Sequence, residues 1–359
     1  MFYSDNILTI RFHSRFESSI MNATNATTPI SNIPGDDIEL AFASFFYIAL
    51  AIAIVFGNTL VITSFIIERR LRTTTNKFLV GLAVSDLLVG LVSVPIWVYF
   101  TIAQLNGTLV ATNIHLAIFF STMDVFSSCA SVLQLTAIGV ERYFAITQPI
   151  NHRACSRRIY NSTAFLIWFC SLAIAGIYPA QINSTWQNEY TLIVFITCFA
   201  LPSGIILFVY VKILRAARVT TRKRVFPDRK TEGKMRIQKE RKIAATIAFI
   251  TLLFVFAWLP FYVVTMIASF CSMKCFPYSL MGINRLVRFV KWMHFSNSAV
   301  NPLVYAYRNV EMRRTFMRIL KSADFCECAG LDNRGSHKLR SRLKNVKGFI
   351  CCQDDCRKQ

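Results

Sequence analysis

Seven long apolar runs limit what this chain can fold into. A helix needs roughly 20 mostly apolar residues to cross a bilayer, where every backbone hydrogen bond must be made within the protein. The chain is 54% hydrophobic and only 16% charged, a composition typical of membrane proteins. We therefore expect an all-α membrane protein, a seven-transmembrane helix bundle within residues 41–306. Its spans are predicted at residues 41–66, 77–101, 114–146, 160–180, 190–215, 241–270 and 281–306.

The formal net charge of +21 is concentrated between the runs. Lys and Arg follow the first, third, fifth and seventh runs, whereas the alternate connections hold few of them, with Lys274 the clear exception. By the positive-inside rule, the basic segments are cytoplasmic and residues 1–40 are extracellular. A nucleic-acid-binding protein would instead gather its basic residues on one soluble face, so no nucleic-acid partner is expected. The sequence predicts a multi-pass plasma-membrane protein with a cytoplasmic C-terminus.

Glycosylation sequons agree with this orientation, because Asn-x-Ser/Thr is modified only on the lumenal side. We expect glycosylation in the extracellular segments, at Asn22, Asn25, Asn106 and Asn183. No charged start, apolar core and small-residue cleavage site precedes the first run, so no cleavable signal peptide is predicted.

The eleven cysteines are not arranged as a disulfide framework. Three lie inside apolar runs, where we interpret them as small apolar residues: Cys129, Cys170 and Cys198. Cys271 and Cys275 lie in the last external connection, an oxidising environment, so a disulfide between them is predicted. In the cytoplasmic tail, Cys326 and Cys328 are placed for palmitoylation beside the membrane.

The third run carries a lone carboxylate at its outer end and a Glu-Arg-Tyr triplet at its inner end. Asp124 and Arg142 are 18 residues apart, which is about five helical turns and about 27 Å, so they share one helix face. Charges inside a span are costly and mark functional sites by default. We expect this helix to link an outer ligand site to an inner coupling site. Glu240 and Trp258 have the same spacing in the sixth run, where Pro260 is expected to kink the helix.

Two polar residues, Asn58 and Asp86, lie in the middle of the first and second runs. Either one alone is explained by hydrogen bonding between packed helices. Together they indicate a buried polar centre, because lipid offers such groups no partner.

The segment after the seventh run predicts a short amphipathic eighth helix over residues 307–322. Its apolar side chains recur every three or four positions among arginines, as in helices that lie on an anionic lipid surface. Residues 323–359 are expected to form a cytoplasmic tail.

The runs carry, in order, Gly57-Asn58-x-x-Val61, Leu82-Ala83-x-x-Asp86, Glu141-Arg142-Tyr143, Trp168, Pro202 with Tyr210, Phe254-x-x-x-Trp258-x-Pro260 and Asn301-Pro302-x-x-Tyr305. Each motif alone is weak, but all of them in order, each in its own run, are specific. The chain resembles a rhodopsin-like (class A) G-protein-coupled receptor. This resemblance implies a receptor rather than an enzyme. Its partners would be an extracellular small ligand, a heterotrimeric G protein, arrestin, a receptor kinase and membrane lipids.

The resemblance also implies roles for residues below the ligand site. The activation switch would comprise Glu141, Arg142, Tyr143, Tyr210, Glu240, Phe254, Pro302 and Tyr305. In the resting state Arg142 would pair with Glu141 and Glu240, and Ile150 would contact the G protein. No cofactor is implied except an allosteric sodium ion, the only metal expected, held at Asp86 with Ser131, Asn297 and Asn301.

Asp124 occupies the position where receptors for biogenic amines carry the carboxylate that pairs with a ligand ammonium. A lone acid in a low-dielectric pocket favours a cation, and aromatic rings add attraction. The ligand-binding residues implied are Asp124, Ser128, Cys198, Trp258, Phe261, Tyr262, Lys291, Trp292 and Phe295. Val194, Phe195 and Cys198 stand where catecholamine receptors present serines, which argues against a catechol. Ala117 replaces the family's usual outer cysteine, as in melanocortin receptors, and the stretch Asn301 to Ile319 is similar to adenosine receptors.

Lys291 leaves the ligand class open. It lies one turn before Phe295 and, on the family pattern, faces the pocket, where it would either neutralise Asp124 or bind an acidic ligand. Arg285, Arg288 and Lys291 recur every three residues. They would form a cationic mouth or extend into the outer interface. The alternatives to an amine are therefore an adenosine-like, lipid, peptide or acidic ligand.

A transporter is the alternative outside this family, because transporters also bury carboxylates in helical bundles. The chain lacks paired inverted repeats and interrupted helices, which are typical of transporters. It also lacks a sequence motif for a metal site, a nucleophile elbow or a phosphate loop, so an enzyme is not expected.

Overall fold

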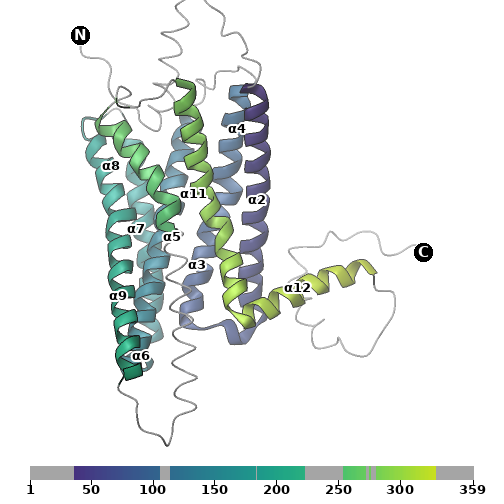
Figure 1. Ribbon diagram of the computed structural model, residues 1–359, viewed down its shortest axis with the longest axis vertical. Coiled ribbons are helices and arrows are strands. Elements are labelled where there is room, and N and C mark those ends of the chain that lie inside the picture. The colour runs from purple at the N-terminus through teal and green to yellow at the C-terminus, as the bar shows by residue number, and fades with distance from the viewer. Residues whose placement is uncertain are drawn as a thin grey trace, which may run out of the picture.

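The computed structural model describes residues 36–105, 114–182, 184–222, 254–271, 275 and 280–328, and every regular element in these ranges is helical. The long helices stand side by side as a bundle, from which α12 turns away at the base of α11 (Figure 1). In chain order they are α2 (Asp36–Ile67), α3 (Thr74–Leu88), α4 (Val94–Leu105), α5 (Ile114–Thr147), α7 (Arg157–Gln181), α8 (Gln187–Phe195), α9 (Leu201–Arg222), the helix Phe254–Phe270, α11 (Leu280–Arg308) and α12 (Val310–Cys328). Two short helices, η1 (Arg69–Leu71) and α6 (Pro149–Ala154), lie in the connections.

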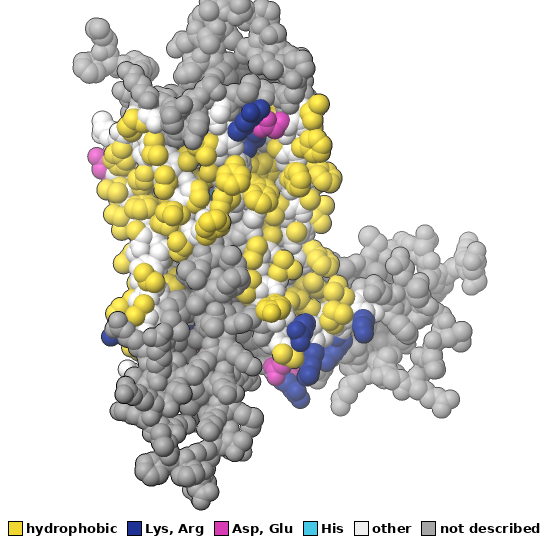
Figure 2. All heavy atoms as spheres, viewed as in Figure 1, with side chains coloured by type: hydrophobic (Ala, Val, Ile, Leu, Met, Phe, Trp, Pro, Cys, Tyr) yellow, Lys and Arg dark blue, Asp and Glu magenta, His cyan; other side chains and the backbone are white. Residues whose placement is uncertain are grey.

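Five helical segments are long and apolar enough to cross a membrane: Ile38–Ile67, Asn76–Ala103, Ile114–Ala145, Arg158–Gln181 and Gln187–Val209. The helix Phe254–Phe270 is apolar but shorter over the described residues, and α11 carries three cations in its outer half. Together these make the seven-helix bundle that the sequence predicts. On the visible face, hydrophobic side chains cover the middle of the bundle, and Lys and Arg side chains gather along α12 (Figure 2).

Two spans contain a π-helical turn directly before a proline. The turn η2 (Val89–Ser93) joins α3 to α4 ahead of Pro95, and η4 (Ile196–Ala200) joins α8 to α9 ahead of Pro202. Proline lacks an N–H donor and its ring crowds the carbonyl four residues earlier, so a wider turn accommodates it. Each π turn also rotates the outer half of its span relative to the inner half, which determines the residues that face the pocket.

The core is built around α5, which packs against α3, α7 and α9. Its buried apolar side chains include Val132 and Leu135, which belong to a cluster with Leu82, Phe254 and Trp258 from neighbouring helices. The helix that the sequence singles out as the link between two sites is therefore central to the bundle.

The amphipathic helix after the seventh span begins at Val310. The side chain of Asn309 caps it by accepting hydrogen bonds from the backbone N–H groups of Glu311 and Met312, at 3.0 and 3.2 Å. Met312 and Phe316 are buried against the bundle. The helix continues to Cys328, six residues beyond the predicted boundary at 322, so Cys326 and Cys328 lie in its last turn.

Candidate functional site

Asp124 and Lys291 form an ion pair in the outer half of the bundle. Lys291 Nζ on α11 donates to Asp124 Oδ2 on α5 at 2.8 Å. Their side chains are only 5% and 9% exposed, respectively. The sequence left open whether Lys291 neutralises Asp124, and in the structure it does.

Four aromatic rings surround the Lys291 ammonium group. Its Nζ lies 4.7 Å from the ring centroid of Phe261, 5.2 Å from Phe120, 5.6 Å from Phe295 and 5.7 Å from Trp97. All are within the range of cation–π attraction. Phe261 and Phe295 were predicted as pocket walls, whereas Phe120 and Trp97 were not. Each lies toward the predicted outer end of its apolar run, and an aromatic residue at that position was the sequence signal that could have identified it.

His294 completes the surroundings of Asp124 and was not predicted. Its Nε2 lies 3.9 Å from Asp124 Oδ1, and its ring lies 3.9 Å, centroid to centroid, from that of Trp258. Its position three residues after Lys291 places it on nearly the same face of α11. Asp124 Oδ1 has no hydrogen-bond partner among the described residues.

A pocket reaches Asp124 from the side of α7 and α8. It has about 690 Å³ of empty space, its mouth included. Of the predicted ligand-binding residues, those that line it are Asp124, Ser128, Cys198, Trp258, Phe261 and Tyr262. The wall from α7 and α8 was not predicted; it includes Gln181, Gln187 and Tyr190. These residues carry no charge and no motif, so their rotation toward α5 is visible only in the structure.

Trp292 is placed away from this pocket. It is 43% exposed and stacks on Phe289, with the ring centroids 6.4 Å apart. It follows Lys291 directly, and successive helical residues point about 100° apart, so both cannot face Asp124. The expected ligand contact of Trp292 has no support in this geometry.

A second buried carboxylate, Asp86, lies among neutral donors. Ser298 Oγ and Ser131 Oγ donate to Oδ1 at 2.7 and 3.4 Å, and Asn301 Nδ2 donates to Oδ2 at 2.9 Å. Asn297, predicted here, is buried next to Ser298, which was not predicted. Carboxylate and hydroxyl oxygens are hard ligands, so this set of residues fits a sodium ion.

Comparisons with known proteins agree with this architecture. The family model described as "7 transmembrane receptor (rhodopsin family)" matches residues 57–181 and 176–305. The chain belongs to this family.

Several relatives of this receptor are similar over most of its length. A probable G-protein coupled receptor of Amphibalanus amphitrite is 30% identical over 85% of this chain and 97% of the relative. Octopamine receptor beta-1R of Drosophila melanogaster is 28% identical over 79% of this chain and 63% of the relative. 5-hydroxytryptamine receptor 7 of Xenopus laevis is 27% identical over 77% of this chain and 75% of the relative. The chain is therefore a G-protein-coupled receptor of the rhodopsin family, and not an enzyme.

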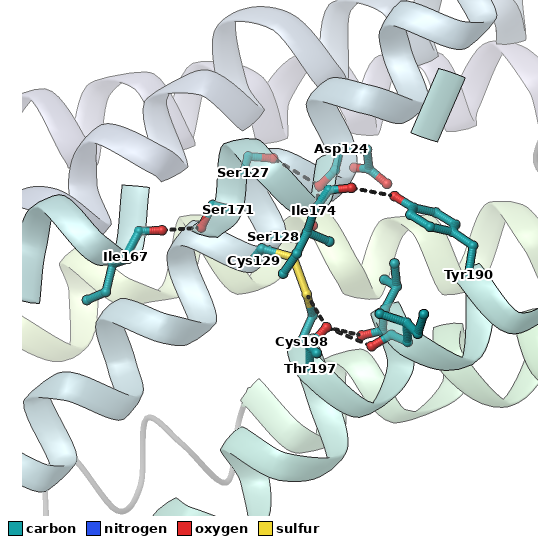
Figure 3. The surroundings of a disulfide bond; sticks show 12 residues. Asp124, Ser127, Ser128, Cys129, Ile167, Ser171, Ile174, Tyr190, Thr197 and Cys198 are labelled. Carbon is teal, nitrogen blue, oxygen red and sulfur yellow. Dashed lines mark hydrogen bonds between the residues drawn. A yellow bond between two sulfur atoms is a disulfide. The ribbon is translucent and has the colours of Figure 1, made fainter. Parts of the chain in front are cut away.

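The receptor has a disulfide inside the bundle, between Cys129 on α5 and Cys198 in the π turn η4. Figure 3 shows it beside Asp124, Ser128 and Tyr190. The interpretation of both cysteines as small apolar residues is therefore wrong. The two Cα atoms are 5.2 Å apart, within the range for a disulfide, and periodicity alone does not predict this. Cys170 is free, and Cys271 and Cys275 are bonded to each other at the position given by the sequence.

The outer arginines of the receptor are paired rather than open to a ligand. Glu39 on α2 contacts Arg285 Nη2 at 2.7 Å and Arg288 Nη2 at 2.8 Å. Neither the cationic mouth nor simple extension into the interface describes them. The missed signal was Glu39 itself, a carboxylate at the outer end of the first span.

At the inner end of the receptor, Arg142 Nε lies 2.8 Å from Glu141 Oε2. Glu141 Oε1 also lies 2.9 Å from His152 Nε2, a neighbour that was not predicted. Ile150 is 81% exposed on α6, accessible to a partner. The other switch residues with described side chains are Tyr143, which is partly buried, and Phe254, Pro302 and Tyr305, which are buried.

Some predicted positions of the receptor cannot be compared with the structure. Outside the described residues lie Glu240, Asn22, Asn25, Asn106 and Asn183. Tyr210 lies in α9, and Cys326 and Cys328 lie in α12, but their side chains are outside the described part.

Proposed function

We propose that this receptor binds an extracellular small molecule bearing an amine through Asp124 and that it activates a heterotrimeric G protein by outward movement of the sixth helix. The observation that carries the proposal is a buried carboxylate at the inner wall of a pocket, with one oxygen free of hydrogen-bond partners among the described residues. A ligand ammonium can donate a charge-assisted hydrogen bond to this oxygen, which Lys291 leaves without a donor. Relatives named for octopamine and 5-hydroxytryptamine support this ligand class.

The signal would pass from the pocket to the inner face through the sixth helix. Trp258 lines the pocket and packs on Phe254 and His294, with ring centroids 5.6 and 3.9 Å away. An agonist that binds one state better than the other shifts the population toward it. In the active state Arg142 would leave Glu141 and Glu240, and Tyr210 and Tyr305 would meet inside the bundle.

The cellular setting belongs to the same proposal. The receptor would lie in the plasma membrane with its N-terminus outside, glycosylated at the four external sequons. Arrestin, a receptor kinase and the inner lipid surface would engage the cytoplasmic face, and palmitate on Cys326 or Cys328 would anchor α12. A sodium ion at Asp86 would stabilise the resting state, and Ile150 would contact the G protein.

A second candidate, an acidic ligand that binds Lys291, is favoured by one observation. Lys291 is buried beside the pocket, and its sole described ion-pair partner is Asp124. A carboxylate or phosphate would have to take Lys291 from Asp124, which would leave that acid buried and unpaired.

The test is G-protein dissociation in cells that express the wild type or Asp124→Asn, screened against amines, amino acids, purines and lipids. We expect an amine-bearing ligand whose response is lost in Asp124→Asn at equal surface expression. The matched control is Glu39→Gln, the same change at a carboxylate outside the pocket, which should keep the response. A response that survives Asp124→Asn but not Lys291→Ala would establish the acidic ligand instead.

A further inference from the structure

The site at Asp124 is already occupied by an ammonium group, and this group belongs to the receptor itself. Lys291 Nζ has one carboxylate oxygen at 2.8 Å and four aromatic rings within 5.7 Å. A protein that binds an alkylammonium ligand provides the same surroundings. Any ligand that binds Asp124 must therefore either displace the Lys291 ammonium or bind beside it.

A simple amine would either displace Lys291 from Asp124 or share Asp124 with it as a second cation. Both side chains of the pair are more than nine-tenths buried, and a buried charge that loses its partner is strongly destabilising. The other carboxylate of the outer half that the structure describes in an ion pair, Glu39, is held by Arg285 and Arg288. His294 adds no anion, because its ring is neutral or cationic. Binding a monocation therefore raises the local charge from zero to +1 in a low-dielectric site.

A ligand with both charges avoids this cost. We propose that the ligand of this receptor is a zwitterion, an amine that also carries a carboxylate, and that it opens the Asp124–Lys291 pair by giving each charge a new partner. Its ammonium binds Asp124 and its carboxylate binds Lys291, so the local charge stays at zero. This inference rests on the proposed function, since it concerns the same carboxylate, and it narrows the ligand class.

Lys291 is not among the described residues that line the pocket, so the ligand carboxylate reaches it only as the Asp124–Lys291 pair opens toward the pocket. Asp124 and Phe261 both line the pocket, and the Phe261 ring lies 4.7 Å from Lys291 Nζ. The ligand ammonium first attaches at Asp124 Oδ1, which has no hydrogen-bond partner among the described residues, and Lys291 then leaves Oδ2 for the ligand carboxylate. An α-amino acid carries its two charged groups on a single carbon, so both reach an ion pair whose atoms are 2.8 Å apart.

The remainder of the pocket is neutral. Asp124 is the sole charged side chain among the described residues that line it. The polar groups elsewhere are amides and hydroxyls, such as Gln181, Gln187 and Thr265, and the aromatic groups include Tyr190 and Tyr262. The rest of the ligand is therefore uncharged, and aromatic or polar.

Matched ligand sets test the proposal. Each set holds an amino acid, the amine that lacks only its carboxylate and the acid that lacks only its amine, for example tryptophan, tryptamine and indole-3-propionic acid. Sets built on tyrosine, phenylalanine, glutamine and serine cover the other uncharged side chains. Binding is measured as the thermal shift of the purified full-length receptor and, separately, as G-protein dissociation in cells.

In the wild type, we expect the amino acid of at least one set to bind at least tenfold more tightly than its amine and its acid. In Lys291→Met, the preference should reverse by at least tenfold in favour of the amine, because Asp124 is then unpaired and no cation remains for the carboxylate. Arg288→Met is the matched control. It removes a cation from the same helix that is paired with Glu39, and it should leave the preference unchanged.

Three results would overturn the inference: an amine or acid preferred over its amino acid in the wild type, a preference that Lys291→Met leaves unchanged, or no binding by any set. Should Lys291→Met fail to fold, the wild-type preference among the amino acid, its amine and its acid alone tests the inference. Asp124→Asn separates this inference from the proposed function. If Asp124→Asn keeps all binding, the proposed function fails. If it abolishes binding while Lys291→Met keeps the wild-type preference, only the zwitterion is wrong.

Discussion

Two carboxylates are buried in the same bundle, and the chain surrounds them in different ways. Asp124, in the outer half, is paired with a lysine and lies near a histidine. Asp86, in the middle of the second span, is bonded only to hydroxyl and amide groups among the described residues: Ser131, Ser298 and Asn301. The first site has no net charge of its own, whereas the second keeps a full negative charge whenever its acid is ionised.

The difference shows what each site can accept. A carboxylate surrounded by neutral donors attracts a small cation without displacing any group of the protein. A carboxylate with a lysine on it accepts a further cation only by exchanging that partner or by leaving a net positive charge in the site. The burial of the two acids is nearly equal and therefore says little about the ligand that each accepts. The charge of the neighbouring side chains determines which ligand each acid accepts.

The largest effect should come from breaking the outer pair. Lys291→Met leaves Asp124 buried without a cation, and removal of one partner of a buried pair costs about 3–5 kcal/mol. Thermal unfolding of the purified receptor measures the loss. Adding Asp124→Asn to Lys291→Met should recover most of it, because the unpaired charge is then gone. If the single variant is as stable as the wild type, the pair is not buried as described.

A smaller effect should distinguish the two acids by their response to sodium. Sodium at about five times its dissociation constant should stabilise the receptor by about 1 kcal/mol. Asp86→Asn should abolish this stabilisation and Asp124→Asn should retain it, since only Asp86 offers hard oxygens without a resident cation. The measurement is the unfolding temperature in sodium chloride against choline chloride at equal ionic strength. Loss of the sodium effect in Asp124→Asn alone would reverse the comparison.

The smallest effect should appear at the outer rim, where Arg285 and Glu39 are 53% and 35% exposed. Exposed ion pairs are worth about 0–1 kcal/mol, because water screens them. Arg285→Met should therefore change the unfolding temperature far less than Lys291→Met, although both remove a cation from α11 that has a carboxylate partner. Comparable losses from the two variants would mean that burial does not set the strength of these pairs.

The sequence was sufficient for the parts of this receptor that depend on length and local period. Seven apolar runs predicted the bundle, and the 18-residue spacing placed Asp124 and Arg142 on one helix. The neighbours of each site depend instead on how far every helix is rotated, and an error of one residue turns a side chain by about 100°. This is why Ser298 donates to Asp86 next to the predicted Asn297, and why Trp292 faces outward beside Lys291.

Contacts between distant segments were beyond the sequence for a second reason. Phe120 and Trp97 meet Lys291 only because three spans converge. Cys129 meets Cys198 within a π turn, where the 3.6-residue period of an α-helix does not apply. Each pairing combines two rotations, and neither rotation is encoded in a 3.6-residue period.

The disulfide between Cys129 and Cys198 ties together two of the spans that line the pocket. Its two cysteines are 69 residues apart, and α6, α7 and α8 all lie within the closed loop. The third and fifth spans are thus covalently joined in the wall of the pocket. The helix Phe254–Phe270 and α11, which carries Lys291, lie outside the loop. Among the described residues that line the pocket, those of the helix Phe254–Phe270 lie outside the loop, so this wall, which holds Trp258, can move without straining the covalent bond.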